Sequence, residues 1–163
     1  MLFAAIFDYR NKIDRATYDA GIKIDEKNLP FKVERYFHMA VMGASRSYKL
    51  WREDNWKYLL QERHQQDGLS VYLTWGNDKE RKAAESLAAQ LGFVKVLPRL
   101  RLKEIAVLLS LSRSLVAVDT GLLHLANALN LPTVGIYPKT SVNNTRTEGR
   151  DYQLIVGGEA ALS

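Results

Sequence analysis

The stretch from 114 to 137 restricts the fold more than any other part of the chain, because strand, sharp turn, helix and strand follow one another directly. Ser114–Val118 has the apolar core that is typical of a strand inside a parallel sheet. It runs into Asp119-Thr120-Gly121, after which a helix is expected over about Leu122–Leu129. Pro132 breaks the chain, and Thr133–Tyr137 is predicted as another buried strand. Two buried strands joined through a helix indicate a β-α-β unit.

The same alternation of apolar runs and helical segments begins at about Tyr36. Gly68 is expected to stop one helix and Gly92 another. Strands that alternate with helices imply right-handed crossovers and a parallel sheet with helices on both faces, so the predicted class is α/β with a Rossmann-like fold. The other strands are predicted over Tyr36–Met42, Leu69–Trp75, Phe93–Leu97 and Tyr152–Val156, and the other helices over Arg52–Gln66, Lys79–Leu91 and Leu102–Ser112.

The length of 163 residues suits one domain with its own apolar core. The first 35 residues do not follow the alternating pattern, because they combine mixed charges with an isolated Pro30. We therefore predict an interdomain segment or partly ordered arm over residues 1–35 and a Rossmann-like domain over residues 36–163. Within that domain, the polar stretch Lys139–Arg150 is predicted to be a loop.

Composition narrows the classes of function. The sequence contains no cysteine, which excludes disulfides, thiolate zinc sites and cysteine nucleophiles. Its net charge of +5 favours anionic partners such as nucleotides, phosphorylated glycolipids or an anionic membrane surface. Scattered lysines that only keep the domain soluble explain the same charge equally well. Nucleic-acid binding is disfavoured, because no helix-turn-helix, RNP or zinc signature is present.

No segment is typical of a membrane span or of a secretion signal. No apolar run reaches the roughly 20 residues that cross a bilayer. The apolar start Met1–Phe7 is short, lacks a basic region and is followed by Asp8. We therefore expect a cytoplasmic product, with any membrane contact peripheral at the inner face of the inner membrane.

The turn at 119–121 offers groups that bind phosphate. Free backbone N–H groups at a helix N-terminus, together with the helix dipole, form an anion site. Gly121 lets a phosphate approach the backbone closely, the Thr120 hydroxyl can donate to it, and His124 lies about one turn further along the helix. The structural interpretation is equally good: Asp119 and Thr120 cap the helix, and His124 is a partly buried polar residue.

Two further loops follow predicted strands and carry polar groups. The first contains Ser45 and Lys49, so it can wrap a phosphate, or it is a solvated basic loop. The second contains Asp78 and Glu80, whose carboxylates can accept hydrogen bonds from ribose or can simply favour a helix N-terminus. Three such loops at the carboxyl ends of parallel strands, each suited to one part of a nucleotide, predict a shared pocket.

Five motifs occur in order along the chain: Lys49-x-Trp51-x-x-x-x-Trp56, Trp75-Gly76 with Glu80, Leu97-Pro98, Val118-Asp119-Thr120-Gly121-Leu122-x-His124-Leu125 and Pro132. Together they resemble the motifs of the ADP-heptose:lipopolysaccharide heptosyltransferases, which form glycosyltransferase family 9. The resemblance covers roughly Gly43 to Thr140 and is closest to the heptosyltransferase I branch. The Asp-Thr-Gly-x-x-His block is the most specific of the motifs.

The resemblance implies a GT-B architecture, in which two Rossmann-like domains face a cleft, and it makes residues 36–163 the C-terminal, nucleotide-sugar-binding domain. The donor would be ADP-L-glycero-D-manno-heptose and the acceptor Kdo of the lipopolysaccharide inner core. Ala44 departs from the family pattern, because relatives carry a hydroxyl residue there. Motif positions imply that phosphate is bound by Ser45 and Lys49, the adenosine ribose by Glu80, adenine by Leu100, the diphosphate by Thr120 and Gly121, and heptose with diphosphate by Asp119 and His124.

The resemblance implies no catalytic base in this chain. The base of the family is an aspartate in the N-terminal domain, and Asp8 and Asp14 lie in the wrong context to replace it. Lys49, Thr120 and the helix N-terminus can stabilise the ADP leaving group, so no metal and no other cofactor is expected. We therefore expect a heptosyltransferase domain that is inactive alone and needs an N-terminal half as its partner. The alternative is a non-catalytic nucleotide-binding remnant or interaction module.

Overall fold

The computed structural model describes residues 21, 22, 24, 29–44, 46 and 49–138, together with the backbone of strand 153–157. Most of the predicted arm over 1–35 lies outside these residues, as do Ser45 and the predicted loop Lys139–Arg150. From the described end of the arm, Leu29, Phe31 and Val33 pack against the apolar core. No helix of the described part is long and apolar enough to cross a membrane.

Strands and helices alternate along the chain as the sequence pattern predicts, and the predicted ends differ from the observed ones by no more than two residues. The strands are β1 (Phe37–Val41), β2 (Ser70–Leu73), β3 (Val94–Val96), β4 (Leu115–Val118), β5 (Thr133–Tyr137) and β6 (Gln153–Gly157). The helices are α2 (Glu53–Asp67), α3 (Asp78–Gln90), α4 (Leu102–Leu111) and α5 (Gly121–Ala128).

The strands form one parallel sheet in the order β3-β2-β1-β4-β5-β6. The chain moves outward from β1 to β3, and the connection through α4 then returns it to the other side of β1, where β4 pairs with it. This is the strand order of a doubly wound Rossmann sheet, and it confirms the predicted fold class. The order reverses between β1 and β4, so the carboxyl ends of these two strands border a crevice.

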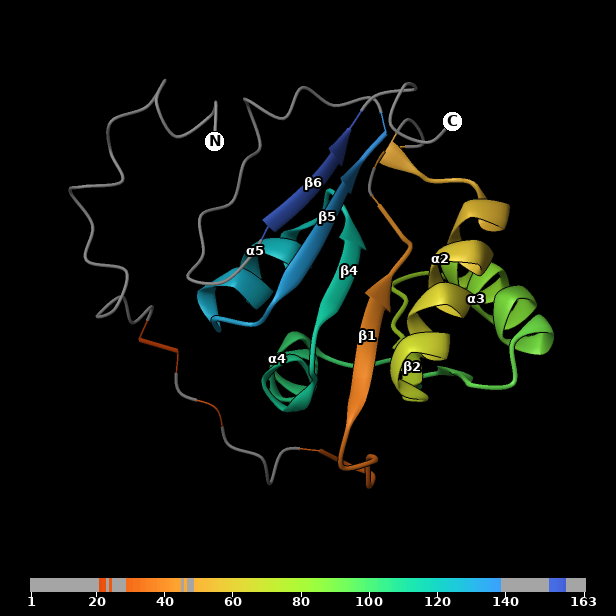
Figure 1. Ribbon diagram of the computed structural model, residues 1–163. Helices are drawn as coiled ribbons and strands as arrows, with labels where there is room; N and C mark the ends of the chain where they lie inside the picture. Colours follow the sequence, from red (N-terminus) through yellow and green to blue (C-terminus); the bar gives the residue numbers. More distant parts are fainter. Residues whose placement is uncertain are drawn as a thin grey trace, which may run out of the picture.

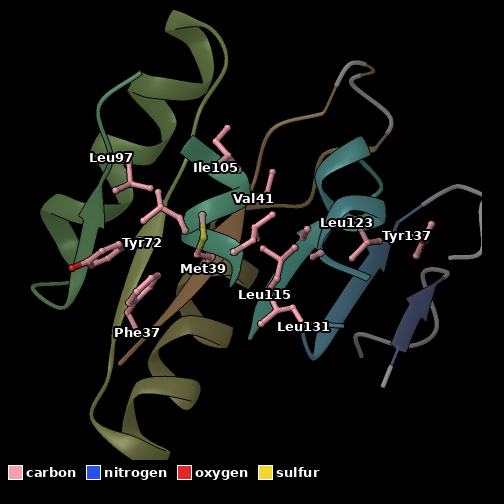
Figure 2. Packing of buried hydrophobic residues seen from close by; sticks show 14 residues of the cluster. Phe37, Met39, Val41, Tyr72, Leu97, Ile105, Leu115, Leu123, Leu131 and Tyr137 are labelled. Atoms are coloured by element: carbon pink, nitrogen blue, oxygen red, sulfur yellow. The ribbon is translucent and has the colours of Figure 1, made fainter. Parts of the chain in front are cut away.

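Helices cover both faces of the sheet, with α4 and α5 on one side and α2 and α3 on the other (Figure 1). Each face has its own apolar cluster. The cluster under α4 and α5 includes Phe37, Met39 and Leu115 from the centre of the sheet (Figure 2). The cluster under α2 and α3 is built around Trp56 and Leu87, both fully buried. Burial on both faces explains why the central strands β1 and β4 are almost entirely apolar, with His38 of β1 as the exception.

The two glycines that were expected to stop helices behave differently. Gly68 follows α2 with φ 72°, in the left-handed region, and its N–H donates to the carbonyl of His64 at 2.7 Å. The end of α3 is instead made by Leu91 in an extended conformation, and Gly92 has no left-handed φ. The prediction that Gly92 makes the C-terminal stop is therefore wrong in its mechanism, although the helix does end at Gln90.

A buried histidine ties α2 to the sheet near the amino ends of the strands. His38 Nε2 lies 2.8 Å from Asp67 Oδ2, and His38 Nδ1 lies 2.8 Å from the hydroxyl of Ser114. A neutral ring that donates to Asp67 and accepts from Ser114 satisfies both contacts. Burial lowers the pKa of His38, the charges of Arg63 and Arg113 act in the same direction, and the Asp67 carboxylate offsets the shift only in part.

We expect the protein to lose stability as the pH falls through about 6.5, the pKa of an unperturbed histidine. Because the folded-state pKa of His38 is lowered, the unfolded chain takes up the proton first and is favoured, and the loss ends below the folded-state pKa. Hydrogen bonds also lower the pKa of Asp67, although its burial opposes the shift. The protonation of Asp67 affects stability only below about pH 4.

Urea unfolding between about pH 5 and pH 7.5 measures this dependence. His38→Gln, which does not titrate, should flatten the slope of unfolding free energy against pH. The matched control is Gln65→Ala, an exposed substitution on α2 that removes no titratable group and should leave the slope as it is. An equal slope in the His38→Gln variant and the unsubstituted chain would contradict the assignment.

Candidate functional site

A cavity of about 700 Å³ lies at the carboxyl ends of β1, β2 and β4. Val41 ends β1, Thr74 follows β2 and Asp119 follows β4, so the cavity occupies the edge of the sheet where the strand order reverses. The arrowheads of β1 and β4 in Figure 1 mark this edge. Its volume lies within the range of small-molecule sites. The lining residues are Val41, Gly43, Ala44, Lys49, Thr74, Trp75, Gly76, Glu80, Leu100, Ile105, Asp119, Thr120, Gly121, Leu122 and His124.

The structure brings together seven of the eight residues that the sequence singled out as donor-binding candidates. They come from the loop after β1, the start of α3, the segment before α4 and the turn between β4 and α5. The eighth candidate, Ser45, lies outside the described residues, and its neighbour Ala44 lines the cavity. The seven residues in the cavity are Lys49, Glu80, Leu100, Asp119, Thr120, Gly121 and His124.

The turn before α5 combines the two roles that the sequence left open. Thr120 is the N-cap of α5, and its hydroxyl oxygen accepts from the N–H of Leu122 at 3.0 Å. Gly121 faces open space, because a Cβ built on it would meet no atom within 4 Å. His124 is exposed on the cavity wall, so its interpretation as a partly buried residue is wrong. The turn therefore caps the helix and presents its N-terminal end to the cavity.

Asp119 does not cap the helix but pairs with Lys49. The ammonium of Lys49 lies 2.6 Å from Oδ2 of Asp119, and the two side chains are 17% and 4% exposed. Lys49 comes from the loop after β1 and Asp119 from the end of β4, and these strands are neighbours in the sheet. The pair therefore joins two of the predicted loops across the point where the strand order reverses.

Glu80 holds the N-terminus of α3 while it lines the cavity. Its carboxylate accepts from the Gly76 N–H at 2.7 Å and from the side-chain amide of Asn77 at 2.8 Å. The Asn77 side chain in turn accepts from the Glu80 N–H at 3.0 Å. The predicted structural role of this carboxylate, at the N-terminus of a helix, is therefore confirmed. Because a carboxylate offers about four acceptor positions, capacity for a ligand hydroxyl remains.

Gly43 packs directly against Glu80. A Cβ built on Gly43 would lie 2.3 Å from the carboxyl carbon of Glu80, much closer than real atoms approach. Because Gly43 has no side chain, the loop after β1 can lie in direct contact with the start of α3. Gly43 was not among the predicted site residues, although it begins the loop that was predicted to wrap a phosphate.

The cavity is also lined by apolar residues for which no binding role was predicted. Ile105, on the first turns of α4, lines it beside Leu100, which is half-buried. Trp75 forms another part of the wall, where its indole N–H donates to the Leu97 carbonyl at 2.7 Å and Arg81 stacks on its ring at 5.4 Å. Trp75 was part of the predicted Trp75-Gly76 motif but was given no binding role, and Ile105 gave no signal beyond helical periodicity.

A family model described as glycosyltransferase family 9 (heptosyltransferase) matches residues 1–161. Lipopolysaccharide heptosyltransferase 1 of Pseudomonas aeruginosa is 46% identical over 117 residues, which are 72% of this chain and 32% of that protein. The protein of the same name from Salmonella typhimurium is 40% identical over 121 residues, 74% of this chain and 38% of that protein. The chain thus spans about a third of the length of these curated relatives.

Solved structures show the same likeness. The Escherichia coli heptosyltransferase WaaC with ADP has a TM-score of 0.71 and 30% identity, with 80% of this chain and 40% of that chain covered. The same enzyme with ADP-2-deoxy-2-fluoro heptose has a TM-score of 0.67 over 80% of this chain and 39% of that chain. These structures confirm the expected Rossmann-like fold of the GT-B type. The chain belongs to glycosyltransferase family 9, the heptosyltransferase family.

Proposed function

We propose that this domain binds the ADP part of ADP-L-glycero-D-manno-heptose, so that the heptose is transferred to Kdo of the lipopolysaccharide inner core at the cytoplasmic face of the inner membrane. The observation that carries the proposal is the single cavity at the reversal of strand order, lined by seven candidate residues. The solved relative with ADP and with a fluorinated ADP-heptose supports a donor of this class.

The polar end of the cavity suits a diphosphate. Lys49 supplies an ammonium, Thr120 a hydroxyl, and α5 the positive end of its dipole. The open space in front of Gly121 lets a phosphate oxygen approach the start of this helix. A sugar attached to that diphosphate would lie near Asp119 and His124, which line the cavity beside it.

Other lining residues of the cavity suit adenosine. Leu100 and Ile105 offer apolar surface for the flat face of a base, and Trp75 lines the cavity as well. Glu80 offers acceptor capacity for ribose hydroxyls from a position that the start of α3 fixes.

The proposed chemistry needs a stabilised leaving group and a base from another part of the enzyme. As the bond to heptose breaks, charge develops on ADP, and Lys49, Thr120 and the α5 N-terminus are placed to stabilise it. Two carboxylates line the described cavity. Glu80 is bonded to the start of α3 and Asp119 is paired with Lys49, so neither is free to deprotonate the acceptor hydroxyl. We assign the base to the N-terminal domain that the family resemblance implies.

We expect this chain to bind ADP in calorimetry at millimolar concentration or below. Lys49→Ala should weaken binding about 10- to 100-fold, because a hydrogen bond to a charged group contributes roughly 1.5–3 kcal/mol. Thr120→Ala should weaken it about tenfold and also remove a helix cap worth about 1 kcal/mol, whereas Thr120→Ser should retain both functions.

The matched control is Lys82→Ala, which removes a lysine from the exposed face of α3, away from the cavity. Equal ADP affinity in the unsubstituted chain, Lys49→Ala and Lys82→Ala would contradict the proposed diphosphate site. Absence of ADP binding by the unsubstituted chain at millimolar concentration would contradict the proposed function itself.

The proposal includes no metal ion, because Lys49, Thr120 and the helix dipole supply the positive potential for the diphosphate. ADP affinity should therefore be the same in EDTA and in excess Mg²⁺. The two titrations, run on the same preparation, measure this directly. A large loss of affinity in EDTA would show that a divalent cation completes the site.

Turnover separates a transferase domain from the alternative of a non-catalytic nucleotide-binding module. With ADP-heptose and Kdo-lipid A as substrates, we expect heptose transfer only when the N-terminal domain of a relative is fused to this chain or added to it. The control is the same N-terminal domain without this chain. If the combination binds ADP but transfers no heptose, the binding-module interpretation is favoured.

A further inference from the structure

The ion pair between Lys49 and Asp119 has one fixed and one movable partner. Asp119 directly follows β4, and its N–H donates to the carbonyl of Ile136 at 3.2 Å, so the sheet holds its backbone. Lys49 belongs to the connection between β1 and α2, where its N–H donates to the Arg46 carbonyl at 3.1 Å. The long lysine side chain crosses from this connection to the carboxylate, whose exposed fraction is 4%.

Burial of the carboxylate makes the pairing hard to break. A buried charge that loses its partner is strongly destabilised, because neither water nor another ion replaces the contact. An anion that enters the cavity therefore meets an ammonium that stays on Asp119. The ammonium has three N–H donors, and the contact with Asp119 leaves the others free to point into the cavity.

We propose that Asp119 is a positioning residue that fixes the ammonium of Lys49 where it contacts the diphosphate of the donor, so that the two side chains act as one unit. This inference rests on the proposed function. Without Asp119, the flexible lysine side chain can extend into water and loses affinity for the diphosphate. Without Lys49, a buried carboxylate is left beside an anionic ligand and repels it.

The pair therefore makes a specific prediction of non-additivity. Asp119→Asn should weaken ADP binding about tenfold, and Lys49→Ala should weaken it more, by up to about 100-fold, because it removes a cation and exposes a like charge. The double variant should bind ADP better than Lys49→Ala alone, because the repelling carboxylate is gone. Adenosine has no phosphate, so its affinity should be unchanged in all three variants.

Calorimetric titration of the 163-residue chain with ADP and with adenosine tests the inference. Asp119→Glu keeps the charge and should retain more ADP affinity than Asp119→Asn. Glu62→Gln is the matched control, since it removes an exposed carboxylate of α2 that does not line the cavity. Circular dichroism checks that each variant is folded, and if Asp119→Asn does not fold, Asp119→Ser, which also removes the charge, takes its place.

Several results would overturn the inference. One is unchanged or tighter ADP binding in Asp119→Asn, and another is a double variant whose loss equals the product of the single losses. Loss of adenosine binding together with ADP binding would indicate a general structural role for Asp119. If Asp119→Asn does not fold, equal ADP affinity in Asp119→Ser and the unsubstituted chain would also overturn it. If the unsubstituted chain binds no ADP, both the proposed function and this inference are contradicted. If it binds ADP and substitution of Asp119 does not change the affinity, only this inference is contradicted.

Discussion

The parallel pairing of β1 with β4 is the contact on which the rest of the structure depends. It brings together two strands that lie far apart in the chain, and it does so because α4 carries the chain back across the sheet after β3. Burial of apolar side chains on both faces fixes which strands lie at the centre. The crevice at their carboxyl ends is a geometric result of this order, and the candidate residues lie there because they directly follow these strands.

The polar groups of the cavity also hold the fold together. Thr120 caps α5, Glu80 closes the start of α3, and Asp119 joins the ends of β1 and β4 through Lys49. In each case an atom that faces the cavity is also bonded to the scaffold. Such bonding limits the number of side-chain conformations before a ligand binds, which lowers the entropy lost on binding.

Local sequence patterns predicted the elements well, because periodicity and helix-ending residues act over a few neighbouring positions. The cavity could be predicted in outline, since strand ends of a parallel sheet lie at one edge. The contacts inside it could not. The Lys49–Asp119 pair and the contact between Gly43 and Glu80 depend on which strands are neighbours, and no local pattern encodes strand order. The buried pairing of His38 with Asp67 was missed for the same reason.

The close approach of Gly43 to Glu80 has a consequence for substitutions in this part of the fold. Any side chain at position 43 displaces the carboxylate, and with it the hydrogen bonds that begin α3. The adjacent Ala44 lines the cavity and packs against the cluster under α2 and α3. A side chain at position 43 would therefore disturb the start of α3 as well as the loop after β1, so this glycine restricts two separate segments of the sheet edge at once.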